Sequence, residues 1–249
     1  MNLLLVEPAE LRDDTVTLSD RRAEHLRSVL GVAPGARVRA GVVGGPLGTA
    51  EVLTDDGTAI ALRLALTDPP STPLAIELVL AVPRPKVLSR TIEIAASFGV
   101  ARIALTNAWR VDKSYLSSPR LLPAALALSA RLGAEQGATT HLPAIAVHRR
   151  LMELLDVRWP AGSPPGLRLV AHPGAPPIES AVRAPVPITL AIGPEGGWIA
   201  REVETFVARG FAPVSLGPAI LRVEAAIAAA LGQLVLLDRL RCSPRDGDP

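Results

Sequence analysis

The spacing of apolar residues changes near residue 70, from a period of two to a mixture of short runs and helical patterns. Apolar and polar residues alternate over 37–43, 49–53 and 60–66, and glycine-containing turn signals separate these stretches. A period of two is typical of strands with one buried face. The first part of the chain, which opens with a short apolar strand over residues 1–7, is therefore predicted to be mostly β.

One helix is expected to interrupt these strands. Ser19 or Asp20 is a suitable N-cap, and Gly31 a suitable stop signal. The apolar residues between them share one face, and the basic residues fall largely outside it. Those basic residues are Arg21, Arg22, His25 and Arg27. The pattern predicts a small barrel that carries a basic helix.

The proline-rich segment 68–73 predicts a linker. After it, the spacing of the apolar residues changes. Strands alternating with helices predict a parallel sheet covered on both faces, so the fold class is α/β. We place one domain at residues 1–70 and a second at 74–242, with a disordered tail at 243–249. The expected strands are 76–82, 103–105, 167–171 and 188–192, and the expected helices are 87–98, 121–135, 199–209 and 223–240.

Composition narrows the function classes. Half of the residues are apolar, but no stretch is long enough to span a bilayer, and no charged-then-apolar leader opens the chain. A single cysteine, Cys242, excludes an internal disulfide, and the four histidines show no metal-ligand spacing. Neither a usual dinucleotide fingerprint nor a nucleophile elbow is present. These features predict a cytoplasmic protein without a metal.

The kind of positive charge is more informative than its amount. The net charge is only +2, and every basic residue apart from histidine is arginine except Lys86 and Lys113. Arginine suits bidentate phosphate contacts, but compositional bias explains the same count. Arg110 and Lys113 follow an expected strand. They either lie in a solvated loop without a specific role or contact phosphate. Aromatic residues make up 3%, which argues against a stacking platform for unstructured single strands.

Two glycine loops carry the strongest functional signal. The first is Ile192–Trp198, which follows an apolar strand and precedes a helix, and the second is Leu216–Arg222, in the same setting. Main-chain N–H groups at such strand-to-helix turns hold small polar ligands. Parallel strands present their ligands at the carboxyl ends, so the two loops predict one pocket built mainly from backbone. Taken alone, the first loop fits a plain tight strand-to-helix turn slightly better than a ligand site.

The start of the last helix offers a charged residue to this pocket. Arg222 and Glu224 stand next to the second loop. One interpretation is that the two residues form a buried structural ion pair. The functional interpretation is that Arg222 is a fixed positive charge beside the ligand.

With these residues the chain resembles the RsmE family, methyltransferases that act on N3 of a uridine in small-subunit ribosomal RNA. The two most specific matches are Gly193-Pro194-Glu195-Gly196-Gly197 and the segment from Leu216-Gly217 to Arg222-Val223-Glu224. The resemblance runs nearly end to end. Supporting matches are His25–Leu30, Glu93–Val100, Arg110, Glu135-Gln136 and His172-Pro173.

The resemblance implies a SPOUT-type parallel sheet with a C-terminal trefoil knot, preceded by a small PUA-like, RNA-binding β-barrel. It also implies S-adenosyl-L-methionine as the cofactor, a homodimer, and ribosomal RNA or the assembled small subunit as the partner. The implied cofactor-binding residues are Ala171, His172, Ile192, Gly193, Gly196, Gly197, Leu216, Gly217, Ile220 and Leu221. RNA contacts are expected from Arg22, His25, Arg27, Arg110 and Lys113.

Catalysis is expected to rest mainly on positioning. Uracil N3 carries a proton near neutral pH, and Arg222 is the candidate that favours the anionic base electrostatically. Glu195, the other catalytic candidate, is expected to organise its loop rather than to act as base. The chain departs from the family at Thr139 or Thr140, in the region where an arginine is usual, and at Ala225, where a threonine is usual. Two alternatives stay open: a knotted methyltransferase with another RNA target, and a non-catalytic RNA-binding or ribosome-assembly factor.

Overall fold

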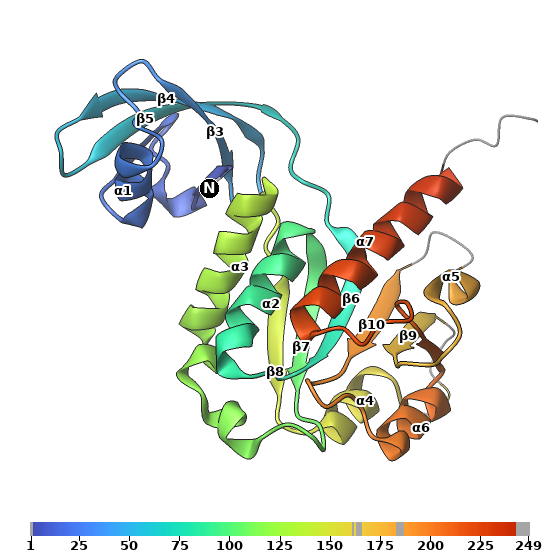
Figure 1. Cartoon of the computed structure of the whole chain (residues 1–249). Coiled ribbons are helices and arrows are strands. Elements are labelled where there is room, and N and C mark those ends of the chain that lie inside the picture. The colour runs from blue at the N-terminus through green and yellow to red at the C-terminus, as the bar shows by residue number, and fades with distance from the viewer. Residues whose placement is uncertain (1, 161, 163–165, 183–186, 243–249) are drawn as a thin grey trace, which may run out of the picture. The chain divides into compact units, whose positions relative to one another are not determined.

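The structure is a computed structural model that describes residues 2–160, 162, 166–182 and 187–242. It divides into two compact units (Figure 1). The N-terminal unit comprises 1–73 together with 96–99 and 130–142, and the C-terminal unit comprises the rest. The tail 243–249, for which disorder is expected, lies outside the described residues.

A five-stranded sheet forms the N-terminal unit, in the order β1-β3-β4-β5-β2. The pairing of β1 with β3 is parallel, and the other pairings are antiparallel. The three alternating stretches are confirmed as strands, because alternate side chains such as Ile60, Leu62 and Leu64 enter one core. The sequence analysis missed β2. The strands are β1 (Leu4–Val6), β2 (Thr15–Leu18), β3 (Arg37–Val42), β4 (Leu47–Asp55) and β5 (Ile60–Asp68).

The expected helix is α1 (Arg21–Ser28), and its start is set by a side-chain cap. The Asp20 carboxylate accepts a hydrogen bond from the backbone N–H of Arg22 at 2.9 Å, as an N-cap does. Gly31 has a φ of +59°, a conformation that favours glycine and ends the helical path. Ala23 and Leu26 are fully buried in the core of the sheet.

Six parallel strands form the C-terminal unit, in the order β11-β9-β10-β6-β7-β8. The expected α/β class with a parallel sheet is confirmed. The strand β10 lies between β9 and β6, and Leu190 pairs with Leu169 on one side and Leu78 on the other. The strands are β6 (Leu74–Ala81), β7 (Val100–Thr106), β8 (Ala144–His148), β9 (Leu167–Ala171), β10 (Ile188–Ile192) and β11 (Phe211–Val214).

The helices connect the strands and leave the loops at the carboxyl ends free to form a site. In Figure 1, α2 and α7 lie in front of the sheet, and α7 packs on β10 through its apolar face. The strand β8 and the helices α4 and α5 were not expected from the sequence. The helices are α2 (Pro85–Ser97), α3 (Pro123–Gly137), α4 (Leu151–Arg158), α5 (Ile178–Ala181), α6 (Ala200–Ala208) and α7 (Val223–Cys242), with short 3-10 turns η1 (Pro8–Glu10), η2 (Lys113–Ser117) and η3 (Pro119–Leu121).

Candidate functional site

The loops after β9, β10 and β11 meet because these strands are neighbours and point the same way. Together they enclose a cavity of about 350 Å³ at the carboxyl ends of the strands. All ten residues expected to hold a cofactor line this cavity. The complete lining is Ala171, His172, Pro173, Ile192, Gly193, Pro194, Glu195, Gly196, Gly197, Ser215, Leu216, Gly217, Ala219, Ile220, Leu221, Val223 and Ala226.

The first glycine loop needs its glycines for close backbone approach. A Cβ on Gly193 would lie 3.0 Å from the backbone nitrogen of Trp198, so a side chain there would push the loop open. Gly197 has a φ of +70°, and its N–H donates to the carbonyl of Pro194 at 2.8 Å, which closes the turn. Trp198 is buried and packs edge-on against Phe206 at 5.0 Å between ring centroids. The loop is thus anchored in the core directly after its last glycine.

Glu195, which lines the cavity, also braces the same loop. Its Oε1 accepts a hydrogen bond from the backbone N–H of Arg84, just after β6, at 2.9 Å. The contact ties the loop to the neighbouring strand and occupies one carboxylate oxygen. This geometry agrees with the expectation that Glu195 organises the loop.

The second glycine loop is held by Ser215 and by a residue that the sequence analysis did not single out. The Ser215 hydroxyl donates to the carbonyl of Gly217 and accepts from its N–H, at 3.0 and 3.2 Å. The Gln233 side-chain amide on α7 donates to the carbonyl of Leu216 at 2.9 Å. Gly217 has a φ of +138°, which only glycine adopts without strain. Ile220 projects into solvent with 88% of its surface exposed.

Arg222 lies immediately before α7, between two residues that line the cavity. Its carbonyl accepts the N–H of Ala226, while its side chain is exposed. Over the described part of the chain, its guanidinium makes neither an ion pair with Glu224 nor any other side-chain hydrogen bond. The alternative of a buried ion pair is therefore wrong, and a cation is left beside the cavity.

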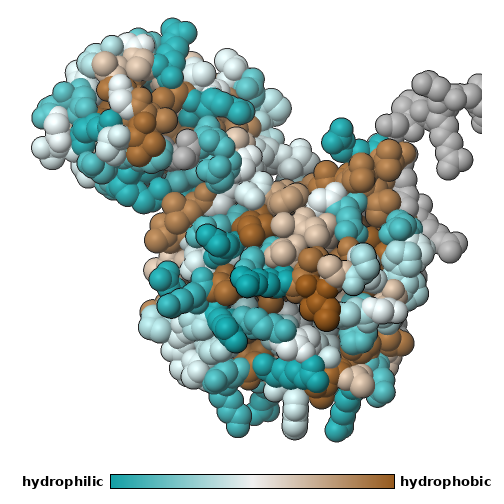
Figure 2. All heavy atoms as spheres, viewed as in Figure 1, coloured by the Kyte–Doolittle hydropathy of each residue, from teal (hydrophilic) through white to brown (hydrophobic). Residues whose placement is uncertain are grey.

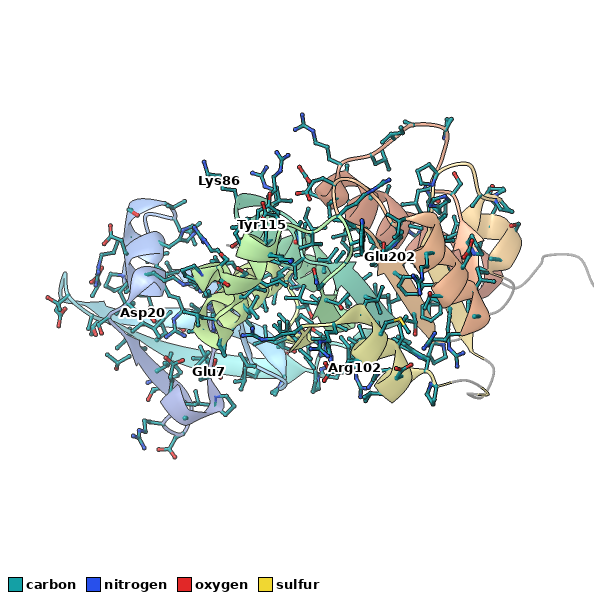
Figure 3. The ribbon with its side chains drawn as sticks, turned by 90° about the horizontal axis from the view of Figure 1, so that it is seen from below. Glu7, Asp20, Lys86, Arg102, Tyr115 and Glu202 are labelled. Carbon is teal, nitrogen blue, oxygen red and sulfur yellow. The ribbon has the colours of Figure 1, made fainter. Side chains whose placement is uncertain are left out.

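The loop after β7 is fastened to the first glycine loop. The guanidinium of Arg110 donates to the carbonyl of Gly196, which lines the cavity. The carboxylate of Glu202 on α6 accepts the N–H of Trp109 at 2.8 Å and that of Ile199 at 3.0 Å (Figure 3). Lys113 begins η2 and is exposed. Glu202 was missed because its partner in the β7 loop lies 93 residues away.

The basic residues of α1 divide into two groups. Arg22 is 5% exposed, and its guanidinium donates to Asp20, Glu10 and the carbonyl of Leu5. Burial lowers the pKa of Arg22, but the hydrogen bonds that its guanidinium donates to the two carboxylates outweigh burial and hold the pKa above its ordinary value. Arg27 donates to Asp55 at 2.9 Å and stays partly exposed, as does His25.

Neither a metal centre nor a membrane segment emerges from the residues that the structure describes. No three histidine, cysteine or acidic side chains gather there in a way that could hold a metal ion. None of the described helices has both the length and the apolar character needed to cross a bilayer.

Fold and cavity together define an α/β protein with a ligand site built from loop backbone at the carboxyl edge of a parallel sheet. The chain belongs to the RNA methyltransferase domain family, whose model matches residues 70–235. The resemblance expected from the two glycine motifs is thereby confirmed.

Named relatives cover nearly the whole chain. It is 29% identical to the ribosomal RNA small subunit methyltransferase E of Treponema pallidum over 237 residues, which cover 92% of this chain and 89% of that protein. It is 28% identical to the Synechocystis protein of the same name, covering 93% and 76%. The crystal structure of the Neisseria gonorrhoeae ribosomal RNA small subunit methyltransferase E bound to S-adenosyl methionine is 26% identical, with a TM-score of 0.76 and coverage of 96% and 98%.

Proposed function

We propose that this protein transfers a methyl group from S-adenosyl-L-methionine to N3 of a uridine in small-subunit ribosomal RNA. One observation carries the proposal: the three loops implied for the cofactor line one cavity. A relative with a similar fold is described as bound to S-adenosyl methionine, which supports the same cofactor here. The protein acts in this proposal as a cytoplasmic enzyme on ribosomal RNA or on the assembled small subunit.

The residues present fit that cofactor. A cavity of about 350 Å³ falls in the range of small-molecule sites, about 300–1000 Å³. Its wall at Gly193 and Gly197 is bare backbone, which lets a nucleoside approach the main chain closely. Ile192, Leu216 and Leu221, which line the cavity, would help to hold it. The cofactor supplies an electrophilic methyl group when bound.

Arg222 is the residue that we assign to the chemistry at uracil. The N3 lone pair becomes available only after the N3 proton leaves, so a fixed cation beside the base stabilises the anion that attacks. Among the residues that the structure describes, the exposed guanidinium of Arg222 has no carboxylate partner to neutralise it. Its neighbours Leu221 and Val223 line the cavity. Glu195 serves this step indirectly, because it holds the loop that shapes the site.

For RNA binding we propose His25 and Arg27 on α1 and Arg110 and Lys113 after β7. Their side chains are partly or fully exposed. Arg22 is left out of this proposal because its guanidinium is buried and already bonded to two carboxylates. Uracil N3 is blocked in a base pair, so the target base must be unpaired or extruded.

We also propose the finer features of the family for this chain. A PUA-like barrel at 1–70 is supported by the five-stranded sheet with its buried apolar core, and a methyltransferase domain at 74–242 by the parallel sheet. A trefoil knot is supported by the path of the chain: after β10 it passes β9 to form β11, and α7 then returns to pack on β10. A homodimer is supported by apolar surface over α7, brown in Figure 2, where Leu236 and Leu240 are exposed.

The decisive experiment measures transfer of a labelled methyl group from S-adenosyl-L-methionine to small ribosomal subunits that lack the modification. Label in ribosomal RNA, mapped to N3 of a uridine, supports the proposal. Label at another position indicates a methyltransferase with a different RNA target. Cofactor binding without any transfer, or no cofactor binding at all, favours a non-catalytic RNA-binding or assembly factor.

A further inference from the structure

Trp109 is an exposed aromatic residue in a chain that otherwise buries its tryptophans. Its side chain is 79% exposed, whereas Trp159 and Trp198 are 7% and 3% exposed. Both of the buried rings pack edge-on against phenylalanines, at 5.4 Å from Phe211 and 5.0 Å from Phe206. Trp109 therefore contributes little to the core, and a large flat apolar surface is left in contact with water.

The backbone that carries this ring is fixed. The N–H of Trp109 donates to Glu202 Oε1 at 2.8 Å, and the next residue, Arg110, bonds the carbonyl of Gly196. Val111, the residue after Arg110, is buried. A ring presented from a fixed backbone loses little conformational entropy when it binds a partner, so the position suits recognition. Gly196 lines the cofactor cavity, which places the loop of Trp109 directly beside the site.

Positive charge surrounds this loop because of the strand order. The strands β6, β7 and β8 are consecutive neighbours, all parallel, so the residues after their carboxyl ends share one edge of the sheet. Two of the acidic groups there accept hydrogen bonds: Asp112 from the N–H of Ser114, and Glu195 from the N–H of Arg84. Glu153, in the first turn of α4, is exposed. We call the exposed cations the basic edge; they are Arg84, Lys86, Arg110, Lys113, Arg149 and Arg150, with Lys86 labelled in Figure 3.

We propose that Trp109 stacks on an unpaired base of the RNA substrate, while the basic edge holds the neighbouring phosphates. The proposal rests on the proposed function and identifies the residue that receives the RNA beside the cofactor cavity. Every nucleobase has a π-face, so one ring can hold a base without reading its identity. A single fixed ring also differs from the stacking platforms that the low aromatic content excludes.

The test compares two probes with the full chain in saturating S-adenosyl-L-methionine. The first probe is a single-stranded oligouridylate, and the second is a chain of abasic ribose phosphates of equal length. Stacking is worth about 1–3 kcal/mol per base, so Trp109→Ala should weaken binding of the oligouridylate by about 5-fold to 150-fold. The abasic chain should bind both proteins alike, and Trp109→Phe should restore most of the affinity for oligouridylate.

Val157→Ala is the matched control. Val157 is 72% exposed near the end of α4, so its substitution also removes exposed apolar surface, but away from the basic edge. Equal loss of affinity for both probes, no loss for either, or no binding of oligouridylate by the unchanged protein overturns the inference. So does a change of oligomeric state in Trp109→Ala, since a second copy then covers the ring. Methyl transfer by the unchanged protein is measured separately. The proposed function can therefore fail while the base contact is supported, and the base contact can fail while methyl transfer is observed.

Discussion

The guanidinium of Arg21 donates to both carboxylate oxygens of Glu135, at 2.7 and 2.9 Å. The Glu135 side chain is only 2% exposed, and its backbone carbonyl accepts the N–H groups of Asn2 and Leu3. One residue near the end of α3 thus binds both α1 and the first residues of the chain. The Glu135-Gln136 motif, which the sequence offered as a family signature, has a structural role in the N-terminal unit.

Loss of this pair should destabilise the protein. Arg21→Ala leaves the buried Glu135 carboxylate without its counter-ion. Because the Arg21 side chain is 39% exposed, the cost should lie between that of an exposed pair, about 1 kcal/mol, and that of a fully buried pair, about 3 kcal/mol. Urea unfolding, followed by circular dichroism, measures the free energy. Arg63→Ala is the control, because Arg63 and Asp14 are both more than half exposed and 3.5 Å apart, and such pairs are worth about 1 kcal/mol or less. Equal costs for the two variants would contradict a special role for the Glu135 pair.

Gly197→Val should weaken cofactor binding strongly. The new side chain is strained at a φ of +70° and adds bulk to a residue that lines the cavity, so we expect the affinity to fall by at least about tenfold. Titration calorimetry with S-adenosyl-L-methionine gives the affinity. Gly57→Val introduces the same kind of strain at a φ of +85° in an exposed turn of the N-terminal unit, and should keep cofactor affinity. Normal binding by Gly197→Val would remove the first glycine loop from the site.

Arg222→Ala should keep the fold and cofactor affinity but lose methyl transfer. Deleting one group that stabilises developing negative charge typically lowers kcat by about 10²–10³. Arg222→Lys should retain part of the rate, because the positive charge remains although the fork of donors is gone. Single-turnover transfer from labelled cofactor to small subunits measures the step. Unchanged turnover in Arg222→Ala would exclude Arg222 from the mechanism.

Acid should weaken the N-terminal unit through Asp20. Burial raises the pKa of this carboxyl, but its hydrogen bonds with Arg22 outweigh burial and set the folded pKa below the ordinary 3.8. A depressed folded pKa gives stability that is present above 3.8 and is lost as the pH falls through the folded pKa. Asp20→Asn keeps a cap acceptor without the charge, so its unfolding free energy should depend less on pH over this acid range. A parallel dependence in both proteins would disprove the assignment.

The sequence predicted the elements whose pattern is local. Alternation over Ile60–Leu66 marked β5, and the apolar run before Ile192 marked the central strand β10. The two glycine loops were visible as well, because close backbone approach and positive φ demand glycine whatever surrounds them. The edge strand β8 was missed, since its side chains are at most half-buried and show no clean alternation.

Partners distant in sequence could not be predicted. Arg22 falls outside the apolar face of α1, so a solvent-facing cation was expected, yet Glu10 and the carbonyl of Leu5 enclose it. The clamp of Glu202 on Trp109 depends on the neighbouring positions of β7 and α6 in space. Such contacts follow from tertiary packing, which neither periodicity nor spacing encodes.

The helix α3 is divided between the two units, with residues 123–129 counted in one and 130–137 in the other. A gene rearrangement that exchanges residues 1–73 for a different RNA-binding module would therefore leave the second half of α3 behind without Arg21, Asn2 and Leu3. The N-terminal module and the second half of α3 should therefore be inherited together. Rearrangements that exchange residues 1–73 without the second half of α3 should be selected against.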